Sequence, residues 1–139
     1  MERIIKFRGQ RTEDGEWIFG YLADKDYINN IYEVATPSEE VHPDTVGQFI
    51  GLLDSNGKEI YDGDVFTVNG KYPKVVKYIP EQTAFCIANI DDFGKDYIYP
   101  WQHPSFDWWN DFKLEITIVG NIYDSTYKHL ISLINNSRI

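Results

Sequence analysis

Four carboxylates lie close together in the middle of the sequence, at Asp54, Glu59, Asp62 and Asp64. Neighbouring carboxyl groups can serve as general acid and base, because one donates a proton while the other accepts it. The same tract holds the turn signals Asn56-Gly57 and Asp62-Gly63, which suit the positive φ angles of tight turns. Asp54 and Asp62 stand where side chains cap such turns, and Asp64 begins a strand. We therefore expect a structural tract, in which only Glu59 lacks an evident role.

The densest run of aromatic residues lies between 97 and 112, where seven of sixteen residues are aromatic. One interpretation is a loop folded over one end of the barrel, whose rings complete the core. The other is a binding surface, because Trp and Tyr are favoured anchors at interfaces. Stacking of single-stranded bases also needs cations, and residues 96–112 contain no Lys or Arg. For a binding surface we expect contact with a protein or with a second copy of the chain, through Tyr97, Tyr99, Trp101, Phe106, Trp108, Trp109 and Phe112.

The net charge of −9 is unevenly distributed: residues 1–11 carry +3, residues 12–64 carry −11 and residues 65–139 carry −1. Proteins bind nucleic acid largely by neutralising phosphates with Lys and Arg, so nucleic acid is an unlikely partner. The alternative of a nucleic-acid-binding accessory module depends on one basic cluster, Arg3, Lys6, Arg8 and Arg11. The acidic segment 12–64 is either a solvated face or a surface for a basic partner.

The sequence carries few signs of catalytic or metal chemistry. Its single cysteine, Cys86, stands in an apolar run, where we expect a small buried hydrophobic residue. The three histidines, His42, His103 and His129, lack metal-ligand spacing, and no Walker loop, dinucleotide fingerprint or nucleophile elbow is present. We expect no cofactor, no metal and no enzymatic activity. A weaker alternative is a small-molecule binder or enzyme whose pocket is walled by the aromatic segment.

No apolar run approaches the roughly 18 residues that cross a bilayer, and the amino terminus lacks the apolar stretch of a signal peptide. We therefore expect a cytoplasmic protein without membrane contact.

Short β-branched and aromatic runs separated by turn residues predict a mainly β chain. The predicted strands cover 3–8, 17–22, 27–34, 45–53, 65–68, 74–78, 83–90, 97–99 and 114–119, and 35–44 is predicted as a loop. Gly20 within a strand indicates a bulge or a close backbone approach. From Asp124 or Ser125 onward, Tyr127, Leu130, Ile131 and Ile134 have helical spacing.

Together these elements predict a mainly β (α+β) fold. We expect a small antiparallel β-barrel or sandwich, SH3-like in its second half, with an N-terminal β-hairpin region and one C-terminal α-helix. A single domain over residues 1–139 is expected, with an N-terminal β region at 1–44 and the barrel with its helix at 45–139.

Four stretches carry a family resemblance: the central tract 46–65, Ile5–Arg8, Trp17–Leu22 and Val119–Tyr123. Taken in the order in which they occur along the chain, these stretches resemble the YopX family of small phage and prophage proteins. The resemblance implies a mostly β fold and an origin in mobile genetic elements, and it implies no established activity or catalytic residues. Two parts depart from the family pattern. Gly9-Gln10-Arg11 stands where many members have Ala-Trp-Asp, and the aromatic region 97–112 is not part of the pattern.

Overall fold

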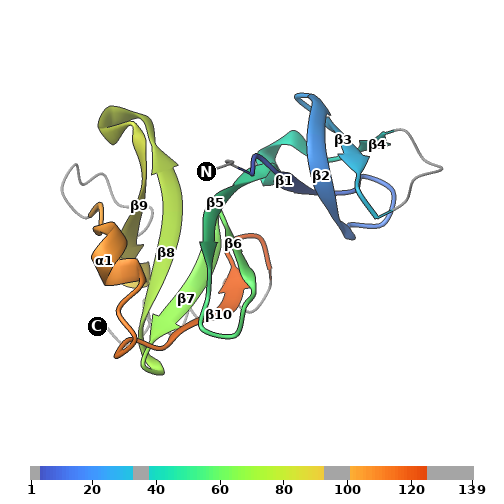
Figure 1. Ribbon diagram of the computed structural model, residues 1–139. Coiled ribbons are helices and arrows are strands. Elements are labelled where there is room, and N and C mark those ends of the chain that lie inside the picture. The colour runs from blue at the N-terminus through green and yellow to red at the C-terminus, as the bar shows by residue number, and fades with distance from the viewer. Residues whose placement is uncertain (1–3, 33–37, 93–100, 125–139) are drawn as a thin grey trace, which may run out of the picture. The chain divides into compact units, whose positions relative to one another are not determined.

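The structure is a computed structural model that describes residues 4–32, 38–92 and 101–124 (Figure 1). The described strands form antiparallel sheets, which confirms the mainly β prediction. The chain divides into two compact units, residues 1–51 and 52–139, and each is described by itself. The strand expected at 97–99 and the C-terminal helix expected from Asp124 or Ser125 lie outside the described residues.

The first unit contains β1 (Phe7–Gln10), β2 (Trp17–Asp24), β3 (Tyr27–Asn30), β4 (Glu39–Glu40), the 3-10 turn η1 (Pro43–Thr45) and the start of β5 (Gly47–Leu53). Its strand order is β4-β3-β2-β1-β5. Ile18, Ile28 and Val41 form its buried core, against which Phe7 and Val46 pack. The prediction of a loop over 35–44 is wrong at Glu39–Glu40, because these two residues pair with Tyr27 and Ile28 of β3.

Gly20 makes the close backbone approach that the sequence indicated. It lies opposite Asn30 in the pairing of β2 with β3. A Cβ atom built on Gly20 would lie 1.8 Å from the carbonyl oxygen of Asn29. Only glycine fits at this point without moving one of the two strands. The register shift of this hairpin lies elsewhere, between Leu22 and Asp24.

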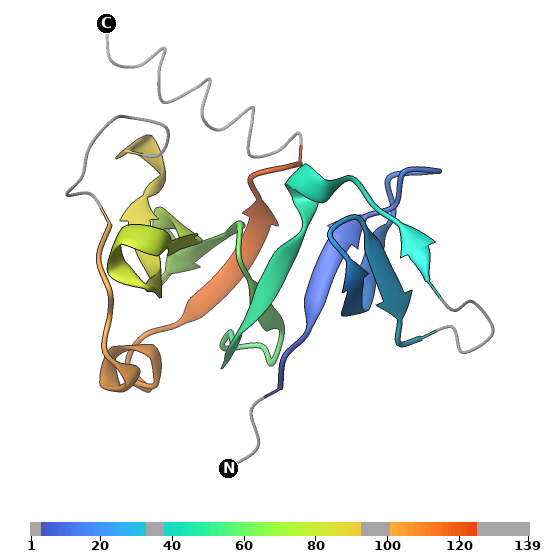
Figure 2. The same cartoon turned by 90° about the horizontal axis from the view of Figure 1, so that it is seen from above.

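The second unit contains the end of β5, β6 (Glu59–Tyr61), β7 (Asp64–Val68), β8 (Lys71–Ile79), η2 (Pro80–Gln82), β9 (Ala84–Asn89), η3 (Ile90–Asp92), the one-turn helix α1 (Phe106–Trp109) and β10 (Ile116–Asn121). Four of these strands form a sheet in the order β10-β7-β8-β9. Figure 2 shows β10, in orange-red, beside the green strands of this unit. The sequence predicts a barrel or a sandwich, and a closed barrel does not form within the described residues, where β9 and β10 are opposite edges of this open sheet.

Turn chemistry sets the register of the β7–β8 hairpin. Asn69 and Gly70 have φ angles of 55° and 74°, and two successive positive φ angles are typical of the type I′ turn that joins twisted strands tightly. The core of this unit includes Val65 and Phe66 on β7 and Val75 and Val76 on β8.

Cys86 on β9 is fully buried, as predicted, and burial raises the pKa of its thiol.

We predict that Gly20→Ala will lower the free energy of unfolding by about 3 kcal/mol or more, because the added methyl group must displace the backbone of β3. Urea unfolding followed by circular dichroism measures this loss. Asn29→Ala is the matched control, since it keeps the neighbouring carbonyl and removes only an exposed side chain. The control should change stability by about 0.5 kcal/mol or less. Equal stability of Gly20→Ala and Asn29→Ala would contradict the close approach.

Candidate functional site

The Asp54 carboxylate joins the central turn to a distant strand. Its Oδ1 atom accepts hydrogen bonds from the main-chain N–H groups of Asn56 and Lys58, both at 2.9 Å. Its Oδ2 atom accepts a third, from the N–H of Ile118 on β10, at 3.1 Å. The side chain is only 7% exposed, so these bonds satisfy a carboxylate that burial would otherwise destabilise. The predicted role in the turn is confirmed, and the bond to β10 is additional.

The other three carboxylates of the tract are also engaged. Asp64 accepts the main-chain N–H of Tyr61 at 2.7 Å and is 2% exposed. Glu59 accepts the Tyr61 hydroxyl at 3.2 Å. Asp62 forms an ion pair of 2.9 Å with Lys77 on β8, a partner that its sequence neighbours do not reveal. The four acidic groups therefore bind N–H groups, a hydroxyl and an ammonium group of the fold.

The described members of the basic cluster are in contact with protein groups. Arg8 is 7% exposed, and its guanidinium carbon lies 4.6 Å from the centre of the Trp17 ring. The ammonium group of Lys6 lies 5.7 Å from the centre of the Phe49 ring. Such cation–π contacts use the charge within the protein. Arg3 lies outside the described residues.

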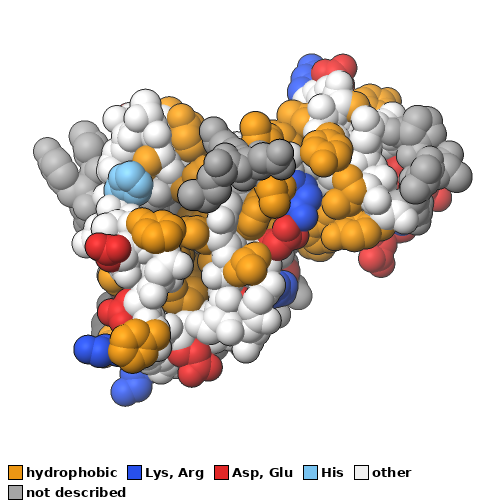
Figure 3. Space-filling model, viewed as in Figure 1, with side chains coloured by type: hydrophobic (Ala, Val, Ile, Leu, Met, Phe, Trp, Pro, Cys, Tyr) orange, Lys and Arg blue, Asp and Glu red, His pale blue; other side chains and the backbone are white. Residues whose placement is uncertain are grey.

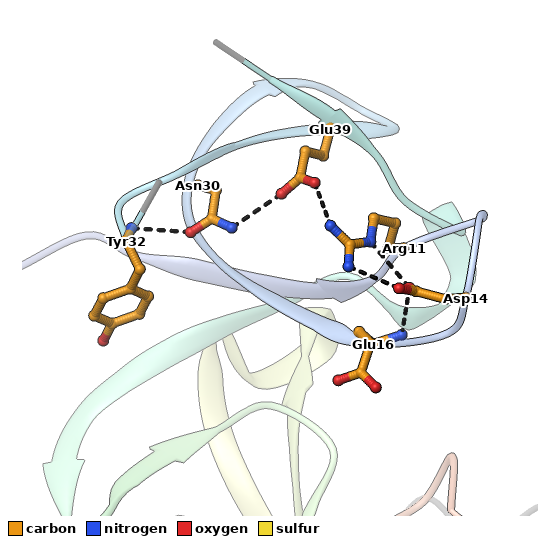
Figure 4. A network of polar contacts seen from close by, with 6 residues as sticks. All are labelled: Arg11, Asp14, Glu16, Asn30, Tyr32 and Glu39. Atoms are coloured by element: carbon orange, nitrogen blue, oxygen red, sulfur yellow. Dashed lines mark hydrogen bonds and ion pairs between the residues drawn. The ribbon is translucent and has the colours of Figure 1, made fainter. Parts of the chain in front are cut away.

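Arg11 is the centre of a polar network that ties the first hairpin to β3 and β4 (Figure 4). Its Nε and Nη2 atoms donate to the two carboxylate oxygens of Asp14 at 2.9 and 2.7 Å, and its Nη1 atom donates to Glu39. Glu39 also accepts a bond of 2.9 Å from the amide of Asn30. The two carboxylates occupy N–H donors of the guanidinium group and offset its charge. The network therefore disfavours a nucleic-acid role for Arg11.

The same network shifts the pKa values of its charged members. The hydrogen bond from Arg11 lowers the pKa of Asp14. The hydrogen bond from Asn30, and after it that from Arg11, lowers the pKa of Glu39. The two carboxylates in turn raise the pKa of Arg11. The sequence could not indicate this network, because Arg11 and Glu39 are 28 residues apart and neither belongs to a motif.

The described part of the aromatic segment is attached to β9 and built around α1. The main chains of Ile87 and Gln102 form two hydrogen bonds of 2.8 Å, in which the N–H group of each residue donates to the carbonyl of the other. Ser105 caps α1, since its hydroxyl oxygen accepts the N–H of Trp108 at 3.2 Å. The Trp109 ring packs on the Phe66 ring with centroids 5.7 Å apart, and Trp108 meets Trp109 edge to face at 5.0 Å.

The predicted contact residues fall into two groups. Trp101, Trp108 and Trp109 are half-buried, as in a loop that completes the core. Phe106 and Phe112 are 72% and 92% exposed. Figure 3 shows exposed hydrophobic side chains, in orange, on the unit that holds β7 to β10. Tyr97 and Tyr99 lie outside the described residues. The structure thus places the exposed apolar surface of this segment at the two phenylalanines.

Two further findings concern metals and membranes. In the described part of the chain, no three His, Cys, Asp or Glu side chains come together as a metal ion would require. His42 and His103 are exposed, and His129 is outside the described ranges. None of the helices within those ranges has the length and apolarity of a membrane crossing.

The fold and the exposed segment define a small, mainly β protein with its open sheets in two compact units. A family model described as "YopX protein" matches residues 6–127. The chain therefore belongs to the YopX family. No curated protein and no solved structure matches it.

We predict that Asp54→Asn will lower the free energy of unfolding by about 1–3 kcal/mol, because an amide keeps one acceptor oxygen and turns an NH₂ group toward a main-chain N–H. Urea unfolding measures the loss. Glu115→Gln is the control, an exposed carboxylate to amide exchange next to β10 that should change stability by about 0.5 kcal/mol or less. If both exchanges had the same small effect, the carboxylate would not join the turn to β10.

We also predict a pH dependence that Arg11 creates. The pKa values of Asp14 and Glu39 are lowered in the folded state. Their stabilising contribution is therefore present above about pH 5 and is lost progressively as the pH falls below about 4, toward the lowered pKa values of the folded state. Thermal unfolding between neutral and acidic pH should show this loss in the unmodified protein. Arg11→Gln should be less stable at neutral pH and lose less on acidification. Lys25→Gln, which removes an exposed cation from a neighbouring turn, should keep the original dependence of stability on pH. If Arg11→Gln also kept the original dependence, the network would be refuted.

Proposed function

We propose that the protein is a non-enzymatic β-domain that acts through protein contact and associates with a second copy of itself. The observation that carries this proposal is the exposure of two large apolar rings, Phe106 at 72% and Phe112 at 92%. When a partner removes apolar side chains exposed to this extent from water, their burial lowers the free energy of the complex. Their attachment to a packed segment makes the gain specific to one geometry.

The backbone that carries Phe106 is held by contacts within the segment. Ser105 caps α1, the amide of Asn110 donates to the carbonyl of Phe106 at 2.8 Å, and Trp109 packs on Phe66. A surface that is ordered before binding loses less conformational entropy when the partner arrives. This preorganisation supports a contact role for the segment in addition to its role in the core.

Charge supports self-association through the second unit. Residues 65–139 carry a net charge of only −1, whereas residues 12–64 carry −11. Two copies that meet through residues 65–139 therefore face less overall repulsion than two copies that meet through residues 12–64, although Asp107 and Asp111 place two carboxylates on the aromatic segment itself. The acidic segment suits a basic partner instead.

We further propose an origin, a location and an arrangement of the second unit. Family membership supports a prophage origin, and we place the protein in the cytoplasm. An SH3-like arrangement of the second unit is proposed from the tight β7–β8 hairpin and its short strands. Nucleic acid is disfavoured by the contacts of Arg8 and Arg11 described above.

We predict that the unmodified protein forms a dimer in sedimentation equilibrium across the micromolar range. The double variant Phe106→Ala/Phe112→Ala should raise the dimer dissociation constant about tenfold or more, because truncated aromatic anchors cost about 1.4 kcal/mol or more of binding free energy.

Tyr21→Ala is the control for this experiment, since Tyr21 is an aromatic residue of β2 that is 59% exposed and lies in the other unit. It should leave the dissociation constant unchanged. A monomer throughout the concentration range, or equal weakening by the double variant and the control, would overturn self-association through this segment.

A further inference from the structure

We propose that a cleft beside α1 binds a small planar aromatic ligand that carries one anionic group, a carboxylate or a phosphate. The cleft has a volume of about 330 Å³ and lies between β8, β9 and the segment leading into α1. Small-molecule pockets range from about 300 to 1,000 Å³. The volume therefore suits a single ring system with one charged substituent. This proposal goes beyond the contact function, which depends on other side chains.

Part of the cleft lining is polar and carries positive charge. It contains Lys74 of β8 with Gln102, His103 and Ser105. The Lys74 ammonium group donates to the amide oxygen of Asn89 at 2.9 Å, which fixes its position and leaves two of its three N–H bonds for an anion. The Ser105 hydroxyl oxygen accepts from Trp108, so its own hydrogen can be donated to a ligand.

The rest of the lining is apolar and suits a ring. Ile87, Pro104 and Trp108 line it. The Trp108 indole is held edge to face against Trp109 at 5.0 Å, and Trp109 packs in turn on Phe66. An indole fixed by its neighbours offers a planar ligand a contact surface without first having to be ordered.

The charge of the lining selects an anion in a chain that is otherwise acidic. The sequence contains 22 Asp and Glu residues, yet among the residues that the structure describes no Asp or Glu lines this cleft. A second hollow of about 330 Å³ nearby is lined by Tyr72, Pro73, Asn89, Ile90 and Asp91. Its described lining includes the Asp91 carboxylate and no Lys or Arg, so it should bind an anion of the same size less well. The two hollows differ in charge rather than in volume.

Isothermal titration calorimetry at low salt tests the proposal with adenosine 5′-monophosphate and indole-3-acetate as the phosphate and carboxylate probes, and with adenosine as the neutral comparison. At least one anionic probe should bind in the micromolar to millimolar range, and adenosine should bind more weakly than its monophosphate. Lys74→Gln should weaken the anionic probe about fivefold, as the loss of a partly exposed ion pair would. It should leave adenosine unchanged.

Lys71→Gln is the matched control, because Lys71 is an exposed lysine of the same strand and lies outside the cleft lining. It should not change the affinity for either anionic probe. Trp108→Leu should weaken all three ligands, and if this variant fails to fold, the lysine pair still decides the outcome. Absence of binding by both anionic probes, or equal weakening by Lys74→Gln and Lys71→Gln, would overturn the proposal. Phe106→Ala/Phe112→Ala should keep the affinity, so a failure of self-association is distinguishable from a failure of ligand binding.

Discussion

The Asp54 carboxylate is the interaction on which the second unit depends. One oxygen accepts two N–H groups of its own turn, and the other accepts the N–H of Ile118, 64 residues further along the chain. Ser55 strengthens the same junction, since its main chain and hydroxyl bond the carbonyl and N–H of Ile116 at 2.8 Å. An edge strand with unpaired N–H groups is open to pairing with another chain. Here two consecutive side chains of a turn cover part of the outer edge of β10, and the tract that looked acidic enough for catalysis holds the sheet in place.

Several charged side chains of both units bind within the fold, whereas two apolar rings of the second unit remain exposed. Arg8 stacks over Trp17, Arg11 binds Asp14 and Glu39, and Lys77 binds Asp62. Phe106 and Phe112 remain in water beside a helix that their neighbours order. This distribution favours a surface that recognises apolar or aromatic groups over one that recognises a polyanion. Lys74 differs from Arg8 and Arg11, because it lines a cleft whose described lining contains no carboxylate. This is why the cleft, rather than the basic first strand, is proposed to bind an anion.

Local features of the fold were predictable from the sequence, and long-range ones were not. The Asn69-Gly70 turn, the close approach at Gly20 and the burial of Cys86 follow from the chemistry of single residues and their neighbours. The pairing of Glu39 with Arg11, and of Asp54 with β10, joins residues whose sequence neighbours give no hint of the partner. The spacing of short strands likewise indicated a barrel or a sandwich, but it cannot say whether the edge strands meet, and the described sheet is open. For the candidate site, composition located the aromatic segment, whereas only packing separated the half-buried Trp108 and Trp109 from the exposed Phe106 and Phe112.

The Asp54 turn holds the sheet of the second unit, and the aromatic segment is proposed to make the contacts between two copies of the chain. Hydrogen–deuterium exchange, measured at a low and a high protein concentration, tests both halves at once. Amides of the Asp54 turn and of β10 should be protected to the same degree at both concentrations, because their bonds lie within one chain. Amides of residues 105–112 should gain protection at the high concentration, where copies associate. Unchanged exchange across 105–112, or a concentration-dependent change confined to the Asp54 turn, would contradict this account.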